Sequence, residues 1–150
     1  MTKRIRGAAI ALALFALALL LGQDARAATL KSKSGFSGDW NWSKGKELLT
    51  LHLEQSGKEL TGWHTAVGQG GLKADEVLRS ASPSITGQID GDTATVTFHS
   101  GFPDSKGNGK AKLTLSGNTL SWNILESSGE HYLPTKAKLK RATPKSSPNP

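Results

Sequence analysis

Apolar and polar residues alternate along most of the chain between residues 38 and 141. Every second residue is apolar in segments such as residues 49–53 and 94–98, and the residues between them are polar. A period of two is typical of β-strands that bury one face and expose the other. The pattern predicts eight strands, whose inward-facing residues are Trp40 and Trp42; Leu49, Leu51 and Leu53; Leu60, Gly62, His64 and Ala66; Ile85, Gly87 and Ile89; Ala94, Val96 and Phe98; Ala111, Leu113 and Leu115; Leu120, Trp122 and Ile124; and Ala137 and Leu139.

Short loops containing glycine set how neighbouring strands pair. The dipeptides at 56–57, 90–91 and 117–118 are typical two-residue hairpin loops, and we expect a type I′ turn at 90–91. In each hairpin, inward residues then face inward residues, which supports the assignment because a one-residue slip would turn the leucines toward solvent. The predicted pairs are Leu53 with Leu60 and Leu51 with Gly62; Gly87 with Ala94 and Ile85 with Val96; and Leu115 with Leu120, Leu113 with Trp122 and Ala111 with Ile124.

Eight consecutive strands with one apolar face close most simply into an antiparallel up-and-down β-barrel. A two-sheet β-sandwich of the same strands is the alternative. The only helix expected is a turn or two within residues 72–79. Successive connections of such a barrel alternate between its ends, so the three tight turns lie together. The longer connections, at residues 43–46, 68–83, 101–108 and 127–134, then form a rim at the other end, where binding is most often done.

The N-terminal segment has the organisation of a secretory signal peptide. Lys3, Arg4 and Arg6 precede an apolar run over residues 8–21, and the small residues Ala25 and Ala27 predict cleavage before Ala28. A membrane anchor is the alternative, but the run is short for a bilayer. The prediction is a signal peptide over residues 1–27, a flexible N-terminus over 28–35, a barrel over 36–141 and a disordered Pro/Ser-rich tail over 142–150, located in the periplasm or outside the cell.

Composition and charge narrow the possible functions. The 150 residues include no cysteine, which excludes disulfides and thiolate metal sites. The formal net charge of +7 falls to +4 once the predicted signal peptide is removed. Five of the remaining basic residues lie within residues 135–150, so the barrel itself is close to neutral and nucleic acid is not an expected partner.

Three short motifs resemble known barrel families. Gly38-x-Trp40 resembles the opening of the lipocalins, while Leu60-Thr61-Gly62 and Ala66-Val67-Gly68 are similar to the second hairpin of avidin and streptavidin. The segment 130–134, Glu-His-Tyr-Leu-Pro, resembles small exported bacterial proteins. The resemblance implies a lipocalin/avidin-like (calycin-type) barrel. It does not extend to the tryptophans that stack on biotin in the avidins.

The histidines and acids offer little catalytic chemistry. On the predicted pairing His52 and His99 face outward, His64 faces inward and His131 lies in the last rim loop, with no spacing typical of metal ligands. We therefore expect no metal, no cofactor and no catalysis. A His64 or His131 within hydrogen-bond reach of a rim carboxylate would favour an enzyme instead. The candidate carboxylates, expected to be solvated loop charges, are Asp75, Glu76, Asp104 and Glu130.

Two groups of residues are candidates for recognition. At the rim and mouth these are Trp42, His64, Phe102, Asp104, His131 and Tyr132, whose aromatic members suit a sugar face or a protein contact. On the outer surface they are Trp63, Lys136, Lys138 and Lys140, where partner contact competes with a plain solvated face.

The balance of small and large inward residues bears on whether the barrel is hollow. An empty cavity of about 300 Å³ would cost on the order of 7 kcal/mol, comparable with the stability of a whole domain. We therefore expect a mostly filled interior with at most a shallow pocket at the long-loop end.

A filled interior favours a non-catalytic binding protein whose rim binds a macromolecule. One version is an inhibitor or immunity-type protein that acts on a hydrolase. The alternatives for the partner are a protein or an envelope polysaccharide, and the alternative function is a carrier of a small apolar ligand in the barrel mouth.

Overall fold

The computed structural model describes residues 35–102 and 104–143. The predicted signal peptide, most of the predicted flexible N-terminus and residues 144–150 of the predicted tail lie outside this range. Within it, no helix has the length and apolar character needed to cross a membrane. The elements are β1 (Gly38–Lys44), β2 (Glu47–Ser56), β3 (Glu59–Gly68), the short 3-10 helix η1 (Gln69–Gly71), β4 (Lys73–Glu76), β5 (Ile85–Asp90), β6 (Thr93–His99), β7 (Asn108–Ser116), β8 (Thr119–Ser128) and β9 (Lys136–Arg141).

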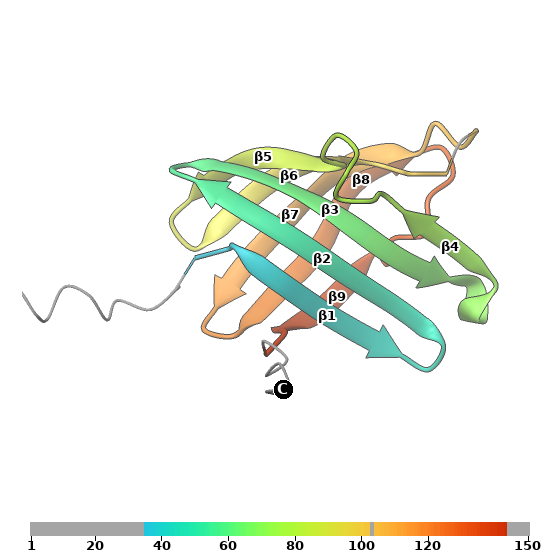
Figure 1. Cartoon of the computed structure of the whole chain (residues 1–150), viewed down its shortest axis with the longest axis horizontal. Coiled ribbons are helices and arrows are strands. Elements are labelled where there is room, and N and C mark those ends of the chain that lie inside the picture. Colours follow the sequence, from blue (N-terminus) through green and yellow to red (C-terminus); the bar gives the residue numbers. More distant parts are fainter. Residues whose placement is uncertain (1–34, 103, 144–150) are drawn as a thin grey trace, which may run out of the picture. The chain divides into compact units, whose positions relative to one another are not determined.

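The strands form a closed antiparallel barrel, shown in Figure 1. Eight strands follow one another around the ring as β1, β2, β3, β5, β6, β7, β8 and β9, and β9 pairs with β1 to close it. Closure removes the free edges that a two-sheet sandwich would leave. The predicted all-β barrel is therefore confirmed. One strand, β4, is additional to the eight.

The extra strand and β5 lie along the same side of β3. Thr65 pairs with Glu76 on β4, and Gly62 pairs with Ile85 on β5. An uninterrupted strand in the β4 register would place Gly62 opposite residue 79, so six residues are inserted between the two pieces. The fourth strand of the barrel is thus interrupted, with β4 and β5 as its two pieces. The helical turn predicted within residues 72–79 is wrong, because residues 73–76 pair with β3 instead.

The tight turns confirm the predicted faces but correct two of the three registers. Leu115 pairs with Leu120 as predicted, whereas Leu53 pairs with Gly62 and Gly87 pairs with Val96. The physical reason is the place of glycine in the turn. Gly57 and Gly91 have φ near +60° and occupy the first central position, the arrangement typical of type II′ turns, so each loop is one residue later than expected. Each pairing moves by two residues, which leaves every side chain on its predicted face.

The interior is filled by one contiguous cluster of side chains. Its largest members are Trp40, Trp122 and Phe98, and the inward leucines of β2, β3, β7, β8 and β9 surround them. At the tight-turn end Phe36 is buried, and its carbonyl accepts a hydrogen bond from Trp40 Nε1 at 2.8 Å. The Arg141 guanidinium covers the Trp40 ring at 4.1 Å from its centroid. The apolar core therefore extends to this end of the barrel and is closed there.

Candidate functional site at the long-loop end

Figure 1 shows the tight hairpins at the left of the view and the other connections at the right. The connections that follow β1, β3, β6 and β8 meet at the right-hand end, as the alternation of strand directions requires. One predicted rim segment needs correction. Of residues 68–83, only those up to η1 lie at the rim, because β4 then runs back along β3 and residues 78–83 leave the barrel wall before β5.

A depression of about 340 Å³ opens at this end. We call it the rim depression. It lies between the ends of β1 and β3, the start of β2, and the connection from β8 to β9. Two carboxylates, Glu47 and Glu130, stand on its border, and Trp42 contributes a half-buried indole. The residues that line it are Trp42, Glu47, Val67, Gly68, Gln69, Gly129, Glu130, His131, Tyr132, Leu133, Pro134 and Thr135.

A buried carboxylate fastens the elements around the rim. Asp75 on β4 is fully buried, and its Oδ1 accepts hydrogen bonds from Gly101 N at 2.7 Å and from His64 Nε2 at 3.2 Å. Its Oδ2 accepts from Ser100 Oγ at 2.8 Å and from Tyr132 N at 3.3 Å. The donors come from β3, from the segment after β6 and from the β8–β9 connection. One side chain therefore holds three separate segments to β4.

The hydrogen bonds continue from His64 to a second hydroxyl. His64 Nδ1 lies 2.8 Å from Ser84 Oγ, just before β5. Because a carboxylate only accepts, His64 Nε2 carries the proton that faces Asp75, and Nδ1 shares a hydrogen bond with the Ser84 hydroxyl. We call Asp75, His64, Ser84 and Ser100 the Asp75 network. It ties both ends of the inserted segment to the barrel interior.

These contacts set the protonation state of Asp75. Burial by itself raises the pKa of a carboxyl group. Here the hydrogen bonds from His64 and Ser100, the electrostatic attraction of the His64 ring and the Gly101 N–H outweigh burial and hold the pKa of Asp75 at about 2. The group is ionised over the whole physiological range. The expectation that Asp75 is a solvated loop charge was wrong, because β4 turns this position toward the interior.

The order of hydroxyl, imidazole and carboxylate in this network resembles that of a hydrolase triad. His64 also lies within hydrogen-bond reach of a carboxylate, which is the condition expected to favour an enzyme. The location argues for a structural role. The exposed fraction is 2% for His64 and Ser84 and 0% for Asp75, so none of the three faces a surface from which a substrate could approach. A general base must reach the proton that it removes. The network instead satisfies buried polar groups and orders the rim.

The remaining rim residues pack around Tyr132. This side chain, a predicted recognition residue of the rim, is buried. Its hydroxyl donates to Glu130, and this hydrogen bond is the main reason that the pKa of Tyr132 rises to about 12. The Phe102 ring meets it edge-on, 5.8 Å between centroids, and Lys73 Nζ lies 5.7 Å from the Phe102 centroid.

The structure brings together most of the predicted site residues. Trp42, His131 and Tyr132 line the rim depression, Phe102 contacts Tyr132, and His64 lies beneath them in the Asp75 network. His131 packs against Phe98 at 5.3 Å between ring centroids, and its Nδ1 is buried without a hydrogen-bond partner in the described part of the chain. Asp104 is exposed in the β6–β7 connection and does not line the depression.

Sequence reasoning missed Asp75, Ser84 and Ser100 as a group. Residues 73–76 carry no apolar alternation, so the sequence contains no signal that β4 exists or that it buries an aspartate. The two serines lie in segments whose composition is typical of loops. Only the predicted inward direction of His64 pointed toward this part of the interior.

The predicted surface residues lie on two walls of the barrel. Trp63 faces outward beside His52, at 5.9 Å between ring centroids, and its Nε1 donates to Ala81 O at 2.9 Å. The inserted segment therefore partly covers this indole. His52 lies between Asp39 and Glu54, at 2.6 Å and 3.2 Å. Lys136, Lys138 and Lys140 are exposed on the outer face of β9.

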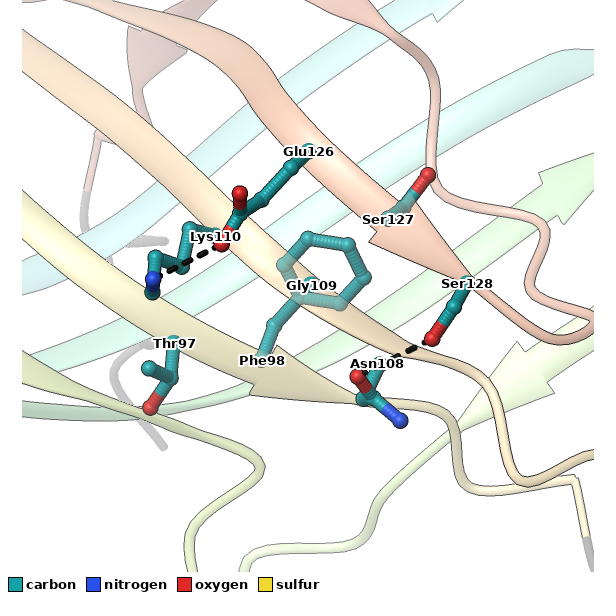
Figure 2. Close-up of a pocket in the computed structure, with 8 residues that line it drawn as sticks. All are labelled: Thr97, Phe98, Asn108, Gly109, Lys110, Glu126, Ser127 and Ser128. Carbon is teal, nitrogen blue, oxygen red and sulfur yellow. Dashed lines mark hydrogen bonds and ion pairs between the residues drawn. The ribbon is translucent and has the colours of Figure 1, made fainter.

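A further hollow, of about 390 Å³, lies on the outer wall near the rim, where β6 and β8 end and β7 begins, as Figure 2 shows. Gly109 lies over the Phe98 ring, and a Cβ built at this glycine would be 2.7 Å from the ring. Lys110 Nζ pairs with Glu126 at 2.7 Å, and Ser128 donates to Asn108 at 3.3 Å. The Phe98 ring and the Glu126 carbonyl therefore occupy the space that a side chain at position 109 would need. The polar residues that border the hollow are bonded to one another.

Among residues 35–102 and 104–143, no three or more histidine, aspartate or glutamate side chains converge as a metal site. Comparison of the chain with protein-family models, with curated proteins and with solved structures finds no match.

Proposed function

We propose that the protein is an exported, non-catalytic binding protein that holds a protruding part of a macromolecular partner in the rim depression. The observation that carries the proposal is an open depression over a filled barrel, bordered by loops that buried hydrogen bonds hold in place. Ordered loops on a rigid scaffold bind with little loss of conformational entropy. An inhibitor or immunity-type protein that acts on a hydrolase would hold a projecting loop of that enzyme in such a depression.

The shape of the interior supports a macromolecular partner over a small apolar ligand. Lipocalin-like carriers need an enclosed apolar space, and here Trp40, Trp122 and Phe98 occupy the centre. The rim depression is open and has carboxylates on its border, which suits a polar or charged projection from a larger molecule. Its half-buried Trp42 provides an aromatic contact of the kind that dominates protein interfaces.

Site-specific photo-crosslinking tests the proposal. A benzophenone amino acid placed at Gln69 or Glu130 stands at the rim depression, and the same amino acid at Ser56 or Ser116 stands at the tight-turn end. All four positions are exposed, so the probes differ mainly in where they point. Irradiation of producing cells should give a discrete crosslinked species from the rim positions and none from the control positions.

Equal crosslinking at both ends, or none at the rim, would contradict the proposal. The carrier alternative is tested separately by native mass spectrometry of gently purified protein. A bound small apolar mass would favour the carrier, whereas the mass of the chain alone agrees with a macromolecular partner.

A further inference from the structure

Charge is distributed very unevenly around the barrel. Strands β7, β8 and β9 carry six basic residues and one acidic residue. The other described residues carry six basic and ten acidic residues. A solvated surface that only prevents aggregation would mix both signs, so this separation calls for another explanation.

Four lysines form a regular array on this side, which we call the basic wall. Lys136, Lys138 and Lys140 follow one another at every second position of β9, about 7 Å apart at the rise of an extended strand. Lys112 on β7 lies in the same cross-strand row as Lys136, with Asn123 of β8 between them. That row spans two strand spacings, about 10 Å.

The charges of these lysines are not neutralised within the described part of the chain. No carboxylate there lies within 4.0 Å of Lys112, Lys136, Lys138 or Lys140, and Lys140 Nζ donates only to the Thr119 hydroxyl, at 3.0 Å. Lys110 is different, since Glu126 pairs with it, as Figure 2 shows. Glu126 is also the one acidic residue on the three strands.

We propose that the basic wall binds an acidic polysaccharide chain through Lys112, Lys136, Lys138 and Lys140. Widely spaced ammonium groups match a polymer with single charges at intervals. Thr114, Ser121 and Asn123 lie between them and can hydrogen-bond to sugar hydroxyls. None of the four lysines lines the rim depression, so this proposal stands or falls independently of the proposed function.

Two other anionic partners fit the wall less well. Proteins that bind single-stranded nucleic acid stack bases on aromatic side chains, and no outward-facing position of β7, β8 or β9 is aromatic. A lipid bilayer presents its charge in one plane, whereas this wall curves over three strands of a barrel. A flexible chain can follow that curvature and reach all four lysines.

The test measures binding of soluble polygalacturonate by the full chain at low and at physiological salt. The first variant is K112Q/K136Q/K138Q/K140Q, and the matched control is K44Q/K46Q/K58Q/K73Q, which removes the same number of charges elsewhere. We expect binding that weakens as salt rises, a loss of roughly tenfold or more in the first variant, and little change in the control. Circular dichroism of each variant shows whether the barrel is retained.

A gain of binding provides the second arm. Glu126→Gln removes the one carboxylate of β7, β8 and β9 and frees Lys110 beside the basic wall, so the affinity for polygalacturonate should rise severalfold. Misfolding would weaken binding and would not strengthen it, so a gain in this variant shows that the charge of the surface controls the affinity.

The remaining outcomes overturn the proposal. Equal losses in both lysine variants would show a response to net charge alone. Binding to vesicles with anionic phospholipids or to oligothymidylate, without binding to polygalacturonate, would assign the wall to a membrane or to nucleic acid. Salt-sensitive self-association in sedimentation experiments, again lost only in the first variant, would identify a second copy of the chain as the occupant.

Discussion

At the scale of single residues, Asp75 connects more segments of the rim than its short side chain would suggest. It is the one fully buried carboxylate of the described barrel, and it accepts hydrogen bonds from four donors on three segments. A buried charge is tolerable only where such donors are complete. We therefore expect the order of the rim to depend on this side chain.

Replacing Asp75 with Asn should destabilise the protein by about 2–4 kcal/mol, because the new amide would present its N–H groups to donors that need an acceptor. Urea unfolding at neutral pH measures the change. Glu76→Gln on the same short strand is the control, since Glu76 is exposed and should shift stability by less than about 0.5 kcal/mol. Equal effects of the two variants would show that the network does not stabilise the fold.

The low pKa of Asp75 predicts an acid-labile component of stability. Its pKa is about 2 in the folded state and about 3.9 in the unfolded chain, so the contribution is complete well above pH 4. It is lost as the pH falls toward 2, and its size is about 2–3 kcal/mol. Free energies of unfolding measured between pH 6 and pH 2 should fall less steeply in Asp75→Asn. Parallel curves for the two proteins would contradict the assignment.

At the scale of elements, the sequence predicted faces better than registers. The alternation of apolar and polar residues identifies all eight strands of the barrel, because a period of two shows which side of a strand is buried. It does not report which of two adjacent residues is the first of a two-residue loop. The prediction therefore puts Gly57 and Gly91 second in their loops, whereas the structure has them first. The broken fourth strand was invisible for another reason. Residues 73–76 are held by hydrogen bonds to β3 and by the buried Asp75, neither of which leaves an apolar period.

Trimming the inserted segment tests the interpretation of β4 and β5 as one strand. Deleting residues 78–83 removes six residues, the number that separates the two registers. The barrel should still unfold cooperatively, with a loss of about 1–2 kcal/mol as the hydrogen bonds to His64 and Trp63 are weakened or lost. Acrylamide quenching of tryptophan fluorescence should increase because Trp63 loses its cover.

Ser84→Ala in the full chain is the companion variant, since it removes the hydrogen bond to His64 and keeps the cover over Trp63. Its quenching should equal that of the wild type. A shortened chain that fails to fold cooperatively, beside a Ser84→Ala variant that folds, would show that β4 and β5 cannot join.

At the scale of the whole barrel, side chains fill the interior, and we expect recognition to take place on its outside. Long-chain fatty acid should therefore leave the thermal unfolding midpoint unchanged, because the interior has no space for it. A ligand that did bind the native state would add about 2.7 kcal/mol of stability at a hundred times its Kd. A rise of several degrees would show that the core can admit a ligand. A soluble protein with an open apolar cavity serves as the positive control.

The interruption of the fourth strand has a practical consequence for work on this protein. The ring of hydrogen bonds already accommodates six additional residues there without losing closure, and Ala81 lies exposed in that excursion. Surface excursions of this kind accept inserted sequence well. An affinity tag or a small reporter placed after Ala81 would project sideways from the barrel, leaving the depression and both ends of the chain unaltered for binding experiments.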